Sequence, residues 1–266
     1  LLHTPHSVDS INMRTVAIIQ ARMGSTRLPG KVAKLIVGVP MLEHMLRREK
    51  TSRTLDEVVV ATTNASEDDA VEEIAKACDV SVYRGSEHDV LDRYYQTAKE
   101  AKADIVVRVT GDCPLHYGDI IDETVEHFLA AKVEYGRSPI NYPEGLDTEV
   151  LTFAALERAW REAKLPSERE HVTPYLYTHP ELFVLGESWQ KGTENNSSMH
   201  WSVDSPNDLV FITAIFEELY PHNPYFAKDE VLAFLKENPA LLDINKGATG
   251  YEGYTKSLAE DKKFTS

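Results

Sequence analysis

The sequence has few cysteines and no long apolar run, and each shortage excludes a class of protein. Cys78 and Cys113 are the two cysteines among 266 residues. They are too few for a disulfide framework or a cysteine-rich zinc site, which favours a reducing, cytoplasmic location. No apolar stretch approaches the roughly 18 residues of a membrane-spanning helix, so we expect no membrane partner. Residues 1–12 lack the apolar core of a signal peptide and are interpreted as a disordered leader before Met13.

Basic residues are also scarce, with 28 Lys+Arg against 43 Asp+Glu and a net charge of −15. Binding along nucleic-acid phosphates needs an excess of Lys and Arg, so we expect no nucleic-acid partner. Hydrophobic residues make up 42% and charged residues 27% of the chain, as in ordinary globular proteins that bury a core. The length fits one large domain that carries an insertion.

The first half of the chain alternates short β-branched runs with amphipathic helical patterns. Strands are predicted at residues 15–19, 57–61, 80–83 and 104–109. Helical stripes of apolar residues lie between and after them, at residues 66–78, 90–98 and 120–128. This alternation predicts a Rossmann-like α/β fold, a mostly parallel sheet with helices on both faces.

The pattern changes after Lys132. Residues 133–200 are interrupted by Pro and Gly and are interpreted as an insertion, with one helix near residues 153–163. A final helix is predicted to begin with Ser205 as its N-cap, Pro206 in the first turn and Asp208 completing a capping box. We therefore assign residues 13–242 to the domain and residues 243–266, rich in Gly, Lys and Thr, to a weakly ordered C-terminal tail.

Polar residues and glycines follow all four predicted strands. Because ligands of an open parallel sheet bind at the carboxyl ends of its strands, this clustering predicts an active site at that edge. The segments concerned are residues 20–31, Thr62-Thr63-Asn64, Arg84-Gly85 and Thr110-Gly111-Asp112-Cys113-Pro114.

Residues 20–31 form a cationic loop in an acidic chain. No acid occurs between residues 10 and 42, whereas five cations do: Arg14, Arg22, Arg27, Lys31 and Lys34. Gly24 and Gly30 allow backbone N–H groups to approach a phosphate closely, and Arg and Lys can bind its oxygens. The spacing differs from that of a Walker loop, and Val32 stands where Ser or Thr would follow the lysine.

Asp112 lies in a tight Gly-Asp-Cys-Pro turn after the fourth strand, where its carboxylate can hold Mg²⁺ against nucleotide phosphates. A second carboxylate is expected, with Asp204 as the first candidate and Asp147 as the alternative. Triphosphate beside carboxylates is repulsive unless a divalent ion lies between them, so the expected cofactor is Mg²⁺.

The motif Gln20-Ala21-Arg22-Met23-Gly24-Ser25-Thr26-Arg27-Leu28-Pro29-Gly30-Lys31 resembles the signature of a known family. These are the cytidylyltransferases that make CMP-activated sugar acids, including acylneuraminate and ketodeoxyoctonate cytidylyltransferases. Residues 84–94, Thr110-Gly111-Asp112-Cys113-Pro114-Leu115 and Glu170-His171-Val172-Thr173-Pro174-Tyr175 are most similar to the spore-coat polysaccharide biosynthesis protein F branch. The resemblance runs from about Met13 to Leu219.

The resemblance implies a nucleotide-diphospho-sugar transferase fold and the reaction CTP + sugar acid → CMP-sugar + pyrophosphate, in surface polysaccharide biosynthesis. It assigns catalysis to Arg22, Lys31 and Asp112, and the metal to Asp112 and Asp204. The nucleotide would contact Gln20, Ala21, Arg22, Gly24, Ser25, Arg27, Lys31, Ala61, Thr62, Arg84 and Gly111. Within this set, Ala61, Thr62 and Arg84 match positions near the base and ribose.

The resemblance also implies a homodimer formed through residues 133–200. The acceptor-binding residues of acylneuraminate and ketodeoxyoctonate enzymes find no match over residues 139–152, so the resemblance does not name the acceptor. Two alternatives to a cytidylyltransferase are a glycosyltransferase that uses a nucleotide-sugar and a non-catalytic nucleotide-binding protein of a polysaccharide pathway.

Overall fold

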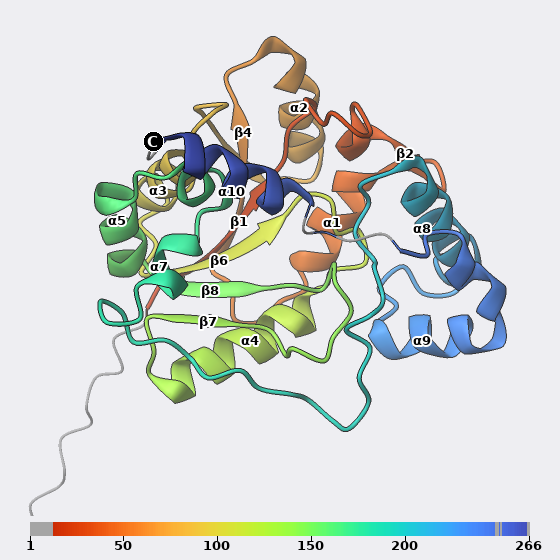
Figure 1. Ribbon diagram of the computed structural model, residues 1–266. Helices are drawn as coiled ribbons and strands as arrows, with labels where there is room; N and C mark the ends of the chain where they lie inside the picture. Colours follow the sequence, from red (N-terminus) through yellow and green to blue (C-terminus); the bar gives the residue numbers. More distant parts are fainter. Residues whose placement is uncertain (1–12, 248–249, 251, 265–266) are drawn as a thin grey trace, which may run out of the picture.

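The computed structural model describes residues 13–247, 250 and 252–264; the expected leader, residues 1–12, lies outside them. A six-stranded sheet with the order β5-β4-β1-β6-β8-β7 forms the centre of the molecule (Figure 1). Its parallel part consists of β1 (Thr15–Gln20), β4 (Glu57–Thr63), β5 (Ser81–Gly85) and β6 (Ile105–Thr110). These are the four strands expected from the sequence, each within two residues of its expected ends.

Alternate residues of the parallel strands enter two separate cores, one on each face of the sheet. In β1, Ala17 and Ile19 belong to one core and Val16 and Ile18 to the other, as the two-residue period of a strand requires. Both faces are therefore buried, which explains why these strands are nearly continuous apolar runs.

Helices cover both faces (Figure 1). The first core receives side chains from α1 (Met41–Glu49), α2 (Asp69–Ala77), α4 (Gly118–Ala131), α8 (Pro206–Leu219) and α9 (Lys228–Glu237). The second receives them from α3 (Val90–Glu100), α5 (Phe153–Glu162) and α7 (Pro174–Thr178). The shorter elements are η1 (Lys31–Ala33), β2 (Leu35–Ile36), β3 (Val39–Pro40), η2 (Ser66–Asp68), α6 (Pro166–His171) and η3 (Pro239–Asp243).

Residues 133–200 extend the main sheet instead of standing apart from it. They supply β8 (Glu149–Thr152), antiparallel to β6, and β7 (Tyr135–Arg137), antiparallel to β8. The sequence did not reveal these strands because they have only 4 and 3 residues and carry buried polar side chains such as Glu149. A mostly parallel sheet with an antiparallel edge is the result.

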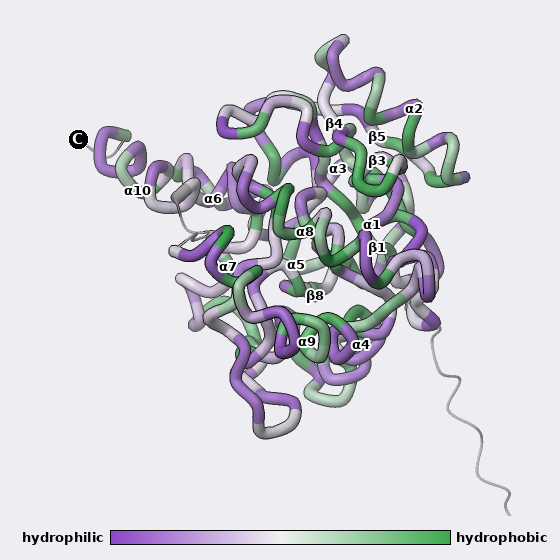
Figure 2. The backbone as a smooth tube through the Cα atoms, turned by 90° about the vertical axis from the view of Figure 1, so that its right-hand side faces the viewer, coloured by the Kyte–Doolittle hydropathy of each residue, from purple (hydrophilic) through white to green (hydrophobic). Residues whose placement is uncertain are grey.

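The C-terminal region contains a helix that the sequence did not reveal. The expected weakly ordered tail, residues 243–266, includes α10 (Glu252–Phe264), which packs against α6. In the side view of Figure 2, α10 lies at the edge of the molecule beside α6 and is largely hydrophilic. Its docking rests on polar contacts, among them the Ser167 N–H donating to Asp261 Oδ1 at 2.9 Å, and such contacts leave no hydrophobic period in the sequence. None of the described helices combines the length and apolarity needed to cross a membrane.

Candidate active site

A cavity of about 880 Å³ opens at the carboxyl ends of β1 and β6. Two of the four segments expected there reach it, the loop that follows β1 and the Thr110–Cys113 turn that follows β6. Gly111 lets the two strand ends meet: its N–H donates to Gln20 O at 2.8 Å. A Cβ at position 111 would lie 2.6 Å from the same oxygen, so no larger residue fits this close approach.

The loop after β1 is folded back by its own backbone and by one buried acid. The Met23 N–H donates to Asp68 Oδ1 at 2.7 Å, and the Gly30 N–H donates to Met23 O at 3.0 Å. Gly30 has a φ of 67°, in the left-handed region where glycine is favoured, and η1 begins directly after it. This turn brings Lys31 into the cavity.

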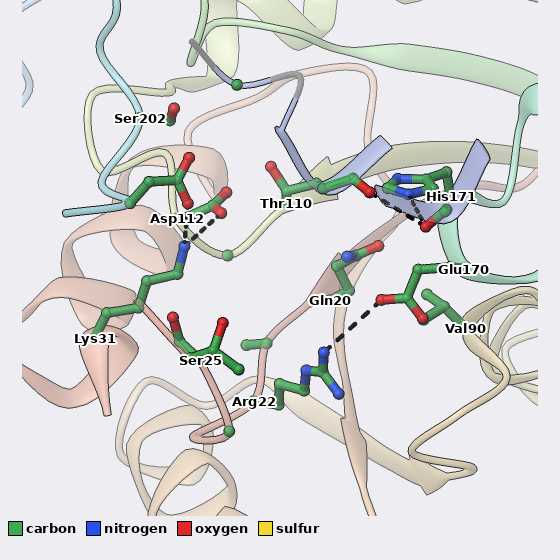
Figure 3. A pocket seen from close by; sticks show the side chains of 18 of the residues that line it. Gln20, Arg22, Ser25, Lys31, Val90, Thr110, Asp112, Glu170, His171 and Ser202 are labelled. Carbon is green, nitrogen blue, oxygen red and sulfur yellow. Dashed lines mark hydrogen bonds and ion pairs between the residues drawn. The ribbon is translucent and has the colours of Figure 1, made fainter. Parts of the chain in front are cut away.

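The Lys31 ammonium lies between the two carboxylates that the sequence singled out (Figure 3). Its Nζ is 2.8 Å from Asp112 Oδ2 and 2.9 Å from Asp204 Oδ1, and it also donates to Val203 O at 2.9 Å. Burial alone would raise the pKa of Asp112, but the charge and hydrogen bond of Lys31 outweigh it and lower that pKa to about 2. The two acids likewise raise the pKa of Lys31 despite its burial. Asp112 and Lys31 are therefore both charged at neutral pH.

Asp112 and Asp204 fit the metal that the sequence predicts. Both carboxylates approach one cation, Lys31 Nζ, within 2.9 Å, so the site already binds positive charge at that point. In the described residues no group of three or more His, Cys, Asp or Glu side chains could hold a metal ion. Mg²⁺ at nucleotide sites takes one or two carboxylates together with phosphate oxygens, and Asp112 with Asp204 offers such a pair.

Asp147, the alternative second ligand, lines the same cavity but does not contact Lys31. Its Oδ2 accepts a hydrogen bond from the Gly145 N–H at 3.1 Å. Burial in the protein raises the pKa of Asp147. The geometry thus favours Asp204 over Asp147 as the partner of Asp112.

Arg27 and Arg22 complete the cationic side of the cavity. Arg27 Nη2 is 2.8 Å from Asp204 Oδ1. Arg22 lies 3.8 Å from both Glu87 Oε1 and Glu170 Oε1, and Figure 3 shows it reaching toward Glu170. Gln20, Ala21, Gly24 and Ser25 also line the cavity. The structure therefore gathers every residue of the expected β1 loop set in one place.

Three residues expected to contact the nucleotide do not line the cavity. Ala61 and Thr62 are fully buried within β4. Arg84 turns toward α2, where its Nη1 pairs with Asp69 at 2.6 Å and Glu72 at 2.9 Å. Base and ribose contacts by these three residues stay a prediction from the resemblance.

The cavity also contains charged residues that the sequence did not single out. They include Arg93, Arg108, Glu144, Arg169 and Lys256. Arg93 lies in the motif at residues 84–94 and Arg108 on a predicted strand, but which of their neighbours they meet at the sheet edge depends on tertiary packing, as it does for the other three. His171, part of the motif that resembles the spore-coat protein F branch, lines the cavity as well.

A buried charged cluster fixes the segment that carries Asp204. His200 Nδ1 lies 2.8 Å from Glu144 Oε2, and its Nε2 lies 3.7 Å from Asp208 Oδ1. Burial alone would lower the pKa of His200, but its hydrogen bonds to Asp208 and Glu144 outweigh this effect and raise the pKa from 6.5 to about 10. Asp208 also forms the capping box with Ser205 at the start of α8, as expected from the sequence.

This cluster predicts a loss of stability at alkaline pH. Because the pKa of His200 is raised from 6.5 to about 10, its stabilising charge is fully present below pH 6.5 and is lost as pH rises through 10. We expect the free energy of unfolding to fall between pH 7 and 10 and His200→Gln to remove most of that dependence. Urea unfolding from pH 7 to 10 measures the free energy of unfolding, and His222→Gln, a change at an exposed histidine, is the control. An equal pH dependence of that free energy in the wild type and His200→Gln would contradict the role of this cluster.

Comparison with known proteins agrees with this geometry. The family model described as cytidylyltransferase matches residues 16–238. An uncharacterized protein of Methanocaldococcus jannaschii is 40% identical over 235 residues, which cover 88% of this chain and 95% of that protein. The spore coat polysaccharide biosynthesis protein SpsF of Bacillus subtilis is 30% identical over 227 residues, covering 84% and 94%. The structure of a cytidylyltransferase from Leptospira borgpetersenii is 35% identical with a TM-score of 0.81, covering 90% and 100%.

A parallel sheet with a cationic loop and two converging acids at its carboxyl edge defines a nucleotidyltransferase enzyme. The match of the cytidylyltransferase family model to residues 16–238 identifies which family of nucleotidyltransferases this is. The chain belongs to the cytidylyltransferase family.

Proposed function

We propose that this enzyme transfers CMP from CTP to a hydroxyl group of a sugar acid and releases pyrophosphate, in the cytoplasm. The observation that carries the proposal is the Lys31 ammonium held between Asp112 and Asp204 beside the Arg22–Arg27 loop. A role in surface polysaccharide synthesis is supported by the similarity to the SpsF protein over most of both chains.

The β1 loop supplies the groups that bind the triphosphate. Arg22, Arg27 and Lys31 neutralise its charge, while the backbone near Gly24 and Ser25 lets N–H groups approach the phosphate oxygens. Lys31 and Arg22 stabilise the charge that moves from the α-phosphate toward the departing pyrophosphate. These positive groups already line the cavity, and charges placed in advance around a reacting phosphate are what electrostatic stabilisation of a transition state requires.

Asp112 and Asp204 would hold Mg²⁺, which would supply the divalent charge that allows two carboxylates to lie beside a triphosphate. The two acids also hold Lys31 in the cavity through the bonds described above. The protein's own contribution is to orient the α-phosphate in line with the acceptor hydroxyl. As in other phosphoryl transfers, positioning and electrostatics account for most of the catalysis.

We propose further that the enzyme is a homodimer formed through residues 133–200. Three large apolar side chains of this segment are exposed: Ile140 at 45%, Tyr177 at 40% and Val184 at 57%. We expect Val184→Asp to shift the protein from dimer to monomer in sedimentation analysis, since a charge at an apolar contact opposes association. A dimer that persists unchanged in Val184→Asp, or a monomeric wild type, would refute this assembly.

Pyrophosphate release tests the proposed reaction. The enzyme is incubated with Mg²⁺, each nucleoside triphosphate in turn, and a panel of nonulosonic, octulosonic and phosphorylated acceptors. We expect pyrophosphate with CTP and one class of sugar acid. A glycosyltransferase would instead liberate a nucleoside phosphate from a nucleotide-sugar, and a binding protein would bind CTP without turnover across the panel.

A further inference from the structure

The active-site cavity extends past the β1 loop toward β6, α6 and α10. The resemblance assigns Gln20 at this end to the nucleotide, whereas the triphosphate groups of the proposed function are Arg22, Arg27 and Lys31. Arg108 faces this end. It lies on β6 two residues before Thr110, on the same side of the sheet. Ile18 of β1 lies opposite Arg108 in the register, and Gln20 lies opposite Thr110. Gln20 and Thr110 point into the space that His171 borders (Figure 3).

Among the described residues that line the cavity, three side-chain atoms are buried without a partner: Arg93 Nε, Arg108 Nε and Gln20 Oε1. The last two, a donor on β6 and an acceptor on the neighbouring strand β1, lie near each other in the sheet register. A buried donor or acceptor without a partner is unfavourable, and native proteins rarely keep one without a reason. A ligand that offers both an anionic acceptor and a hydroxyl donor would satisfy both atoms.

Arg108 is held firmly in this position. It forms an ion pair with Glu149 across the β6–β8 ladder, and Glu149 also accepts hydrogen bonds from Tyr135 and Thr173. Thr173 follows Val172, which is fully buried and has a φ of 72°. A β-branched residue in the left-handed region is strained, and such strain persists where the surrounding structure enforces it. The α6–α7 turn is therefore fixed against the Arg108–Glu149 pair.

Helix α10 completes this end of the cavity from the other side and crosses near the carboxyl ends of β1 and β6 (Figure 1). Ser257 Oγ lies 3.0 Å from His171 Nε2, and the Tyr254 ring meets the His171 ring edge-on at 5.1 Å. Burial, together with the nearby Arg108 charge, lowers the pKa of His171 to about 4. His171 is therefore a neutral anchor for α10 and not a competing cation.

Lys256 of α10 is one of two cavity-lining cations without a carboxylate partner among the described residues; the other, Arg93, donates to Ser86 O. Arg22, Arg27, Lys31, Arg108 and Arg169 each have a carboxylate partner. Lys256 has no ion pair with any described residue, although it lies on the cavity wall beside Ser257. The family model ends at residue 238, so α10 and its lysine lie outside the part of the chain that the family model matches.

We infer that Arg108, Lys256 and Gln20 form the acceptor subsite, in which the two cations bind the carboxylate of the sugar acid and Gln20 accepts a hydrogen bond from an adjacent hydroxyl. This inference rests on the proposed function, whose triphosphate already occupies Arg22, Arg27 and Lys31. A neutral sugar would leave Arg108 Nε and the Lys256 ammonium without an anion. The subsite therefore selects acids over neutral sugars.

The test compares Lys256→Gln with Lys263→Gln, a control on the exposed part of α10 away from the cavity. The probes are 3-deoxy-manno-octulosonate and N-acetylneuraminate. For the acid that reacts, we expect Lys256→Gln to raise the acceptor KM about 10-fold or more, the usual effect of losing a charged hydrogen bond. The KM for CTP should stay within about twofold, and Lys256→Arg should recover most of the affinity. An unchanged acceptor KM in Lys256→Gln overturns the subsite.

A second measurement separates this inference from the proposed function. It uses no Arg108 variant, because loss of Arg108 would leave the buried Glu149 without its ion-pair partner. If CTP binds but no acid releases pyrophosphate, the proposed function fails. Calorimetric titration of the CTP-loaded protein with the same two acids then decides the subsite. Weaker binding by Lys256→Gln than by Lys263→Gln supports it; equal binding by the two variants, or no binding to the wild type, overturns it.

Discussion

Replacement of Asp112 by Asn should reduce Mg²⁺-dependent pyrophosphate release from CTP by at least about 10²–10³-fold, the range found for preorganised electrostatic groups. Asn keeps the size of the side chain but removes the negative charge that Lys31 Nζ meets at 2.8 Å. It also removes one of the two carboxylates that fit the metal. Initial rates of pyrophosphate release at saturating CTP measure the effect.

The fold should survive this change, because Lys31 still pairs with Asp204 at 2.9 Å. Thermal unfolding followed by circular dichroism checks this. Asp119→Asn is the matched control, since Asp119 is exposed on α4 a few residues away and does not line the cavity. Turnover like that of the wild type in Asp112→Asn would remove Asp112 from the mechanism.

Replacement of Lys31 by Met should have two opposite effects. Turnover should fall about 10²–10³-fold, because the group that stabilises charge at the α-phosphate is lost. Binding of Mn²⁺ in the absence of nucleotide should strengthen about tenfold, because the ammonium that lies between Asp112 and Asp204 no longer occupies their oxygens. Paramagnetic resonance of free Mn²⁺ measures the second effect without any turnover.

Lys34→Met provides the control for Lys31→Met, since Lys34 lies just after η1 and does not line the cavity. It should leave turnover and metal affinity close to those of the wild type. An Mn²⁺ affinity in Lys31→Met no greater than in the control would show that the ammonium and the metal do not share the acid pair.

The sequence predicts those elements whose spacing of apolar residues matches the side chains that are buried in the structure. In β1 and β4, consecutive β-branched residues are buried on both faces of the sheet, which a buried parallel strand requires. The start of α8 was equally predictable, because Ser205 and Asp208 form their capping box locally. Strands β7 and β8 were not, since Tyr135 and Glu149 are buried polar residues satisfied only by distant partners.

The candidate site likewise has residues that the sequence predicts and residues that only the structure brings together. The loop after β1 could be recognised because its cations and glycines are contiguous in the sequence. Asp204 is 173 residues from Lys31, so the sequence could offer it only as the first of two candidates, and the fold shows the two side chains together. For Arg84, the position in the motif suggests a contact with the nucleotide. In the structure its side chain pairs with Asp69 and Glu72. Lys256 carries no motif, and only the docking of α10 on α6 places it in the cavity.

The most direct test of the central claim follows the α-phosphate of CTP. The enzyme, Mg²⁺ and the reacting sugar acid are incubated with CTP labelled at the α-phosphorus, and the products are separated. Our account predicts that all of the transferred label is found in a CMP-sugar, with one equivalent of unlabelled pyrophosphate. Label released as free CMP, or intact labelled CTP after prolonged incubation with every acid of the panel, would contradict it.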